Sequence, residues 1–154
     1  MNIIIIGAGT FGTAIANELS VNKDNNVMLF SRCQNKVNEI NTFHTNRSCF
    51  PNKYLNQALL ASCEKMDIRN ADIIFIALPS SVIIENFLEL KNFFKKDVLI
   101  VNLSKGLFLG GVTIVDSIKE KLNTDNIVTL KGPSFAIEMI EHAETLLTLG
   151  YKKK

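Results

Sequence analysis

The chain has 154 residues, of which 47% are hydrophobic, and it carries a formal net charge of +2 at neutral pH. This length suits one well-buried domain and is too short for two ordinary ones. The small charge gives no reason to expect a nucleic-acid partner, and the apolar runs are too short to cross a membrane. Because the sequence opens without a basic leader or a cleavage site, we expect a cytoplasmic protein. Three cysteines without CxxC spacing predict reduced thiols and no metal site.

Apolar runs alternate with helical stretches along the chain, which is the pattern of βαβ units in a mainly parallel sheet. Predicted strands cover residues 2–6, 27–30, 73–78, 98–101, 127–129 and 146–149, with a weaker one at 59–62. Predicted helices cover residues 10–21, 34–41, 80–94, 111–122 and 134–142, and residues 42–57 are expected to form a long surface connection. The pattern predicts a Rossmann-like, doubly wound α/β domain over residues 1–150, with helices on both faces and a basic tail at 151–154.

The first predicted strand leads into a GxGxxG turn, with glycines at 7, 9 and 12, and then directly into a helix. Gly7 permits a tight turn, Gly9 lets the backbone approach a pyrophosphate, and Gly12 lets helix and strand pack closely. The amides of the first helical turn then carry partial positive charge toward that pyrophosphate. This segment therefore predicts a dinucleotide-binding cradle.

Ligands of doubly wound sheets lie across the carboxyl ends of the strands. The loops that begin at Gly7, Ser31, Pro79, Ser104 and Lys131 are therefore expected to converge. In the loop that begins at Pro79, the proline ends the hydrogen-bond ladder of the strand, and Ser80, which follows it, is expected to cap a helix.

The second predicted strand ends in Ser31, Arg32 and Cys33, where an NAD-selective fold usually offers an acidic residue to the ribose 2′-hydroxyl. An arginine here can pair with a 2′-phosphate and stack on adenine. The alternative is a surface arginine without a ligand. The pattern favours NADP, or the use of both NADP and NAD.

Two later loops carry candidate substrate residues. Lys105 follows a strand and stands beside Gly106, although a lysine in a loop is usually just solvated. The second loop follows Lys131 and contains Ser134, which is expected to be the N-cap of a helix whose first turns Glu138 serves. A capped helix start would explain that loop by itself, but its amides and hydroxyl could also face a small polar substrate.

Five segments together resemble the cofactor domain of the NAD(P)-dependent glycerol-3-phosphate dehydrogenases. They are GAGTFGTA at residues 7–14, LFSR at 29–32, ALPS at 77–80, NLSKG at 102–106 and KGPSFAIE at 131–138. KGPSFAIE is the most specific of them, and the resemblance extends to about residue 150.

The resemblance implies reversible hydride transfer between C2 of sn-glycerol 3-phosphate and C4 of a nicotinamide, which yields dihydroxyacetone phosphate and supplies glycerophospholipid synthesis. By position it implies that NADP or NAD is bound by Gly7, Gly9, Thr10, Phe11, Gly12, Arg32, Cys33, Lys105 and Ala136. It implies substrate contacts from Lys105, Gly132 and Ser134. It also leaves open a homodimer of the full-length protein.

The chain departs from the family pattern at two positions and at its end. Phe108 stands where the family usually has an acidic residue, and Ile137 stands where it usually has a basic one. The helical second domain, which carries the general-base lysine in the family, is expected to be absent. Because loss of a general base costs about 10²–10⁴-fold in rate, we expect little or no turnover by this chain alone.

Two other interpretations stay open at the level of the sequence. One is another two-domain dehydrogenase of the hydroxyacyl-CoA or 6-phosphogluconate type, against which KGPSFAIE argues. The other is a nucleotide-binding remnant without enzymatic activity.

Overall fold

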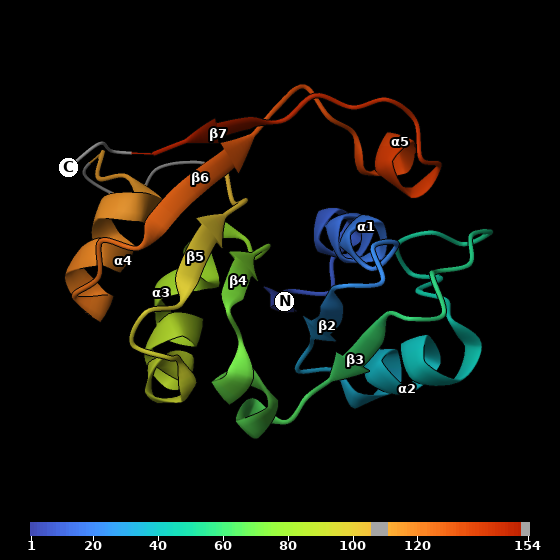
Figure 1. Cartoon of the computed structure of the whole chain (residues 1–154), viewed down its shortest axis with the longest axis horizontal. Helices are drawn as coiled ribbons and strands as arrows, with labels where there is room; N and C mark the ends of the chain where they lie inside the picture. Colours follow the sequence, from blue (N-terminus) through green and yellow to red (C-terminus); the bar gives the residue numbers. More distant parts are fainter. Residues whose placement is uncertain (106–110, 152–154) are drawn as a thin grey trace.

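A computed structural model describes residues 1–105 and 111–151 of the chain, and it contains a seven-stranded sheet in the order β3-β2-β1-β4-β5-β6-β7 (Figure 1). The strands are β1 (Asn2–Ile6), β2 (Asn26–Phe30), β3 (Leu60–Ser62), β4 (Ile73–Ile76), β5 (Leu99–Asn102), β6 (Ile127–Lys131) and β7 (Thr148–Gly150). The first six strands pair in parallel, whereas β7 runs antiparallel to β6. The strand order reverses direction between β1 and β4, which is the topological switch point of the sheet.

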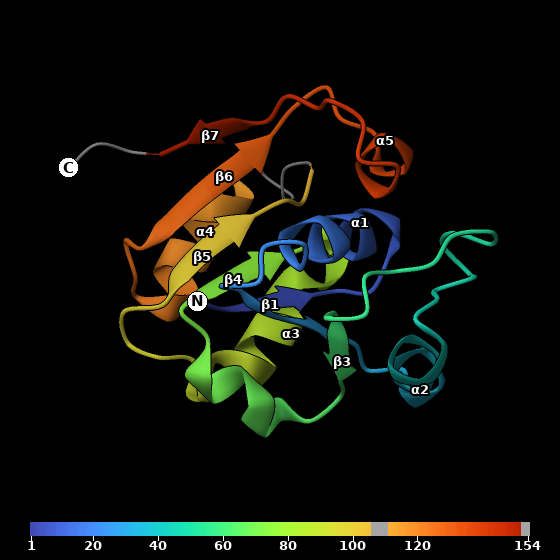
Figure 2. The same ribbon diagram turned by 45° about the vertical axis from the view of Figure 1, so that its right-hand side comes forward.

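Helices cover both faces of the sheet (Figure 2). They are α1 (Thr10–Leu19), α2 (Gln34–Phe43), α3 (Ser80–Leu90), α4 (Ile114–Leu122) and α5 (Ala136–Ile140), with 3-10 turns η1 (Lys65–Asn70) and η2 (Lys91–Phe93). One apolar core lies between the sheet and α1, α2 and α5, and a second core lies between the sheet and α3 and α4. After β6 the chain crosses to α1, forms α5 beside it, and returns as β7 (Figures 1 and 2).

The central strand β1 shows why the sheet needs both layers. Its isoleucines alternate in direction: Ile3 and Ile5 belong to the core under α1, while Ile4 and Ile6 belong to the core under α3. All four side chains are buried. A strand that is apolar on both faces is stable only when both are covered, which confirms the predicted doubly wound α/β class.

The predicted elements are all present, with shifted ends. The helix predicted to continue to residue 94 ends at Leu90, and η2 follows it. The prediction runs too far because the apolar spacing continues past the end of the helix to Phe94, whose ring meets that of Phe87 at 5.4 Å between centroids. The strand predicted to continue to residue 78 ends at Ile76. Helix α4 begins at Ile114, three residues later than predicted, because the Thr113 hydroxyl caps it.

The predicted connection at residues 42–57 is present between α2 and β3, but it does not lie wholly on the surface. Phe50 and Leu55 in this segment are 3% and 4% exposed, and Asn46 is fully buried. The segment folds back against α1, where the Asn17 carboxamide accepts a hydrogen bond from the Asn56 amide at 2.7 Å.

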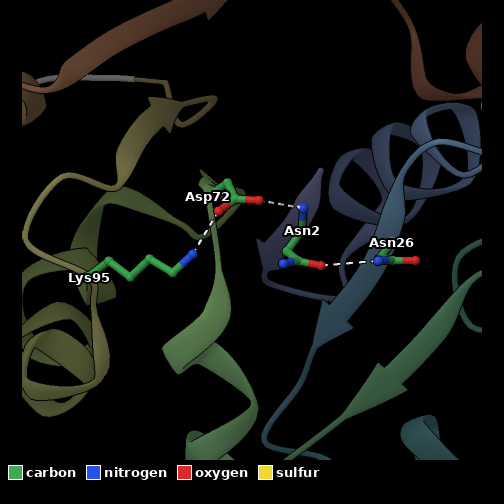
Figure 3. Close-up of polar contacts among 4 residues, drawn as sticks. All are labelled: Asn2, Asn26, Asp72 and Lys95. Atoms are coloured by element: carbon green, nitrogen blue, oxygen red, sulfur yellow. Dashed lines mark hydrogen bonds and ion pairs between the residues drawn. The ribbon is translucent and has the colours of Figure 1, made fainter.

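Polar contacts join four segments at the amino edge of the sheet (Figure 3). The Asp72 carboxylate accepts hydrogen bonds from the Asn2 amide at 2.8 Å and from the Lys95 ammonium at 2.7 Å. Asn26 donates to the Asn2 side chain at 3.1 Å. The hydrogen bond from Lys95 and that from Asn2 lower the pKa of Asp72.

Several sequence expectations fall on residues that the structure does not describe. Gly106, Phe108 and most of the predicted tail at 151–154 lie outside the described residues. Within the described ranges, every helix is too short or too polar to serve as a membrane span.

Candidate functional site

A cavity of about 520 Å³ lies at the carboxyl edge of the sheet, at the switch point between β1 and β4. Four of the five loops expected to converge line it, namely those that follow β1, β4, β5 and β6, whereas the loop after β2 does not. The lining residues are Gly9, Thr10, Phe11, Gly12, Ala77, Leu78, Pro79, Leu103, Ser104, Lys105, Leu130, Lys131, Gly132 and Ser134.

The three glycines of the turn after β1 differ in what surrounds them. Gly7 has φ of +117°, and a Cβ there would lie 2.5 Å from the Ala77 carbonyl oxygen. A Cβ on Gly12 would lie 2.1 Å from the Gly7 carbonyl oxygen and 2.9 Å from Cβ of Ala77. Gly9 is different, because its backbone is extended and a Cβ there would meet no atom within 4 Å. The fold therefore requires Gly7 and Gly12, whereas Gly9 keeps a space open beside the start of α1.

Residues that the sequence analysis did not single out support this turn through hydrogen bonds. The carbonyl oxygen of Ala8 accepts hydrogen bonds from the Lys36 ammonium at 3.0 Å and from the Asn46 carboxamide at 3.3 Å. Asn46 also donates to the Thr13 hydroxyl at 2.9 Å, inside α1. These bonds fix the turn against α1 and α2. Nothing in the local pattern around Asn46 distinguishes it from an ordinary loop residue.

A second hollow, of about 220 Å³, lies on the other side of the turn, where β2 ends. Gly7, Ser31, Arg32 and Cys33 are among its lining residues. Arg32 is exposed and makes no hydrogen bond or ion pair with the residues that the structure describes. The nearby carboxylate of Glu89 pairs with Lys65 instead. The hydrogen bond and the charge of Lys65 lower the pKa of Glu89, and the charge of Arg32 lowers it to a smaller extent. Arg32 is thus a cation available to a ligand in this hollow.

Lys105 and Lys131 both line the large cavity, from the ends of two neighbouring strands. The Lys131 ammonium donates to the Ser104 carbonyl oxygen, and the Ser104 hydroxyl donates to the Leu78 carbonyl at 2.6 Å. These bonds join the loops after β4, β5 and β6. Burial lowers the pKa of Lys131, and the charge of Lys105 lowers it further.

The prediction that Ser134 caps the following helix is wrong. The N-cap of α5 is Phe135, whose backbone amide donates to the Glu138 carboxylate at 3.2 Å. Glu138 thus serves the first turn, as expected, and the Ser134 hydroxyl is buried without a hydrogen-bond partner among the described residues. Ser80 likewise does not cap α3, since its N-cap is Pro79.

The structure brings most of the predicted site residues to one edge of the sheet. Gly9, Thr10, Phe11, Gly12, Lys105, Gly132 and Ser134 line the large cavity, and Gly7, Arg32 and Cys33 line the smaller hollow. Ala136 lines neither of them, because as the first residue of α5 it packs on the core under α1.

The residues present fit a dinucleotide. The open space at Gly9, the free amides of the first turn of α1 and the two hollows on either side of the turn suit a diphosphate with a nucleoside on each side. Fold and site together define the class of this protein: a Rossmann domain of the kind that binds dinucleotides.

Comparison with known proteins identifies the family within that class. Residues 2–154 match the family described as the NAD-dependent glycerol-3-phosphate dehydrogenase N-terminus, and the chain belongs to it. The chain is 33% identical to glycerol-3-phosphate dehydrogenase (NAD(P)+) of Mesoplasma florum and 31% identical to that of Neorickettsia sennetsu. The matches cover 97% and 100% of this chain, respectively.

A solved structure gives the same answer. The crystal structure of glycerol-3-phosphate dehydrogenase from Coxiella burnetii superimposes with a TM-score of 0.87 at 28% identity, over 96% of this chain and 46% of that one. The chain also covers 46% of each of the two relatives above, so it spans about half of their length.

Proposed function

We propose that the chain binds NADP or NAD at the carboxyl edge of its sheet and forms the cofactor-binding part of an enzyme that interconverts sn-glycerol 3-phosphate and dihydroxyacetone phosphate. The observation that carries the proposal is Gly9, a glycine that neither backbone conformation nor packing requires, in a turn that faces the cavity. The family to which the chain belongs supports the reaction.

Each part of the dinucleotide has candidate partners in the chain. The amides of Thr10 and Phe11, in the first turn of α1, would hold the diphosphate over Gly9. Arg32 would pair with a 2′-phosphate in the smaller hollow, which favours NADP over NAD. A bound nicotinamide cofactor supplies or accepts the hydride.

The substrate would lie at the end of the cavity formed after β5 and β6. Lys105 can stabilise negative charge on the reacting oxygen, and the Ser134 hydroxyl can donate a hydrogen bond that no described residue satisfies. The tight approach at Gly132, where a Cβ would lie 2.2 Å from the Leu146 carbonyl oxygen, keeps that loop close to the sheet.

We further propose that the chain by itself turns over little or no substrate. By the resemblance, the general-base lysine of the family belongs to the helical second domain, outside the 46% of the relatives that this chain matches. Removal of a general base lowers rates by about 10²–10⁴-fold. We place the protein in the cytoplasm with a small phosphorylated metabolite as its partner; the net charge of +2 gives no support to a nucleic-acid partner.

A fluorescence titration of the purified chain with NADPH and with NADH, each with and without dihydroxyacetone phosphate, tests the proposal. Saturable binding of both cofactors, tighter for NADPH, is the expected result. A folded chain that binds neither cofactor would overturn the proposal and favour a remnant without nucleotide binding. Titration with the substrates of hydroxyacyl-CoA and 6-phosphogluconate dehydrogenases tests the other enzyme class.

A further inference from the structure

Lys131 has a position that the proposed roles of the other residues leave unexplained. It is the last residue of β6, it is half-buried, and it lines the large cavity between Leu130 and Gly132. Its ammonium donates one hydrogen bond to the Ser104 carbonyl. A lysine has three N–H donors, so two remain for another acceptor.

The charges around Lys131 are unbalanced. The described residues that line the cavity include two lysines, Lys105 and Lys131, and no aspartate or glutamate. Burial and the charge of Lys105 both disfavour the charged form of Lys131, whose pKa is lowered. Buried amines are normally paired with an anion, since an unpaired buried charge is costly. The missing negative charge points to an anionic ligand.

The neighbours of Lys131 narrow the chemistry of that ligand. The Ser134 hydroxyl lacks a partner among the described residues and lines the same cavity. The remaining donors of the Lys131 ammonium and the Ser134 hydroxyl suit a phosphate group with several acceptor oxygens. A phosphate could come from the diphosphate of the cofactor or from a phosphate monoester. Lys131 lies at the end of β6, beside the proposed substrate residues Gly132 and Ser134, which favours the monoester.

We propose that Lys131 binds the phosphate monoester of the substrate together with the Ser134 hydroxyl, while Lys105 stays at the reacting oxygen. This inference rests on the proposed function and adds a specificity-determining residue to it. The contact is a charge-assisted hydrogen bond, with no bond made or broken. It selects the phosphorylated triose over its uncharged counterpart.

The test compares the wild-type chain with Lys131→Met, Lys131→Arg and a control variant, Lys96→Met. Lys96 is an exposed lysine at the amino edge of the sheet, so its replacement removes the same charge far from the cavity. Each protein is saturated with NADPH and then titrated calorimetrically with dihydroxyacetone phosphate, with inorganic phosphate and with dihydroxyacetone.

We expect Lys131→Met to weaken binding of dihydroxyacetone phosphate about ten-fold or more, the size of a lost charge-assisted hydrogen bond. Binding of NADPH and of dihydroxyacetone should change less than two-fold. Lys131→Arg should restore most of the loss, because it keeps the charge, and Lys96→Met should match the wild type.

A pH series adds a measurement that a purely structural role would not change. Affinity for dihydroxyacetone phosphate should fall as pH rises through the lowered pKa of Lys131, because the neutral amine no longer attracts the anion. Among the described groups, the cation that faces Lys131 is Lys105, and the Ser104 carbonyl is the hydrogen-bond partner of Lys131. In Lys131→Arg this alkaline loss should move to higher pH.

Three outcomes would overturn the inference. Weaker NADPH binding with an unchanged affinity for the triose phosphate would assign Lys131 to the cofactor diphosphate. Equal losses for dihydroxyacetone and its phosphate, or a lower melting temperature without a change in affinity, would mean that Lys131 only joins β6 to the Ser104 loop. Absence of triose-phosphate binding by the NADPH-loaded wild type would also reject it, whereas absence of NADPH binding would reject the proposed function itself.

Discussion

Individual residues in the turn after β1 separate the demands of folding from those of binding. A side chain on Gly12 has no room, because its Cβ would overlap the Gly7 carbonyl, whereas a side chain on Gly9 would point into open space. The two glycines look equivalent in the GxGxxG pattern. Their surroundings assign Gly12 to the packing of α1 on β1 and leave open space at Gly9, where we propose that the diphosphate lies.

Gly9→Ala and Gly12→Ala should therefore have opposite effects. Gly9→Ala should change the free energy of unfolding by less than about 1 kcal/mol, since the new methyl group touches nothing and the backbone is extended. It should still weaken NADPH binding about ten-fold or more, because the methyl group occupies the path of the diphosphate. Gly12→Ala should cost about 3 kcal/mol, because backbone atoms must move.

Urea unfolding and fluorescence titration measure the two effects separately. Unchanged NADPH affinity in a stable Gly9→Ala protein would contradict the placement of the diphosphate at this turn.

Arg32 should set the preference between the two cofactors. Its guanidinium lines the hollow after β2 and pairs with no acidic residue among those described. Arg32→Ala should weaken NADPH binding about ten-fold and leave NADH binding within about two-fold, because only NADPH carries a 2′-phosphate. Parallel titrations with both cofactors measure this, with Arg47→Ala, at another exposed arginine, as the control. An equal loss for both cofactors would assign Arg32 to a part of the dinucleotide that they share.

At the scale of elements, the segment at residues 42–57 supports the turn that carries Gly9. Asn46 within it is fully buried, and its carboxamide joins the Ala8 carbonyl to the Thr13 hydroxyl. The segment thus acts as a buttress between α2 and α1. It holds the turn in shape without entering the cavity.

Asn46→Ala should destabilise the fold by about 2 kcal/mol, because it removes three side-chain hydrogen bonds, among them the one to the buried Thr13 hydroxyl. It should also weaken NADPH binding, since the turn loses one of the groups that hold Ala8. Asn52→Ala, in an exposed part of the same segment, should stay within about 0.5 kcal/mol of the wild type. Thermal and urea unfolding provide the comparison. Equal effects of both substitutions would contradict the proposal that Asn46 supports the turn.

The sequence predicts the elements of this fold better than it predicts what joins them. β1 and the glycine turn follow from apolar runs and glycine spacing, which are local signals. The burial of Asn46 depends on partners in distant segments, so a polar stretch with proline reads locally as surface. The position of Ser134 before a helix predicts a cap, but α5 begins two residues later and the Ser134 hydroxyl has no hydrogen-bond partner among the described residues.

The whole molecule has one edge held by polar contacts and one edge left open. At the amino edge, Asp72 joins the backbone of Asn2 to the ammonium of Lys95 (Figure 3). At the carboxyl edge, the loops surround the cavity and the hollow beside it. The polar contacts that join the strands and the cavities that could hold a ligand thus lie at opposite ends of the strands.

The pH dependence of stability should report the amino edge. The pKa of Asp72 is lowered in the folded state, so its contribution is fully present above its ordinary value of 3.8 and is lost as pH falls through the lowered value. Asp72→Asn should therefore be less stable than the wild type at pH 7, and the difference should shrink as pH falls below about 4. Urea unfolding over a pH series checks this. A difference that stays constant down to pH 2 would exclude the ionised carboxylate as its source.

The position of β1 in the sheet also constrains the order in which the chain can fold. Ile3 pairs with Val27 on one side and with Ile73 on the other, so β1 must pair with a strand about 70 residues further along the chain. Contacts between distant segments are slow to form, whereas β1, α1 and β2 are close in sequence. We expect that first unit to gain hydrogen-exchange protection early in refolding and β5 and β6 to follow, which pulse labelling would detect. Simultaneous protection of all strands would rule out this order. The ligand cavity, which needs loops from both halves, would be the last feature of the protein to appear.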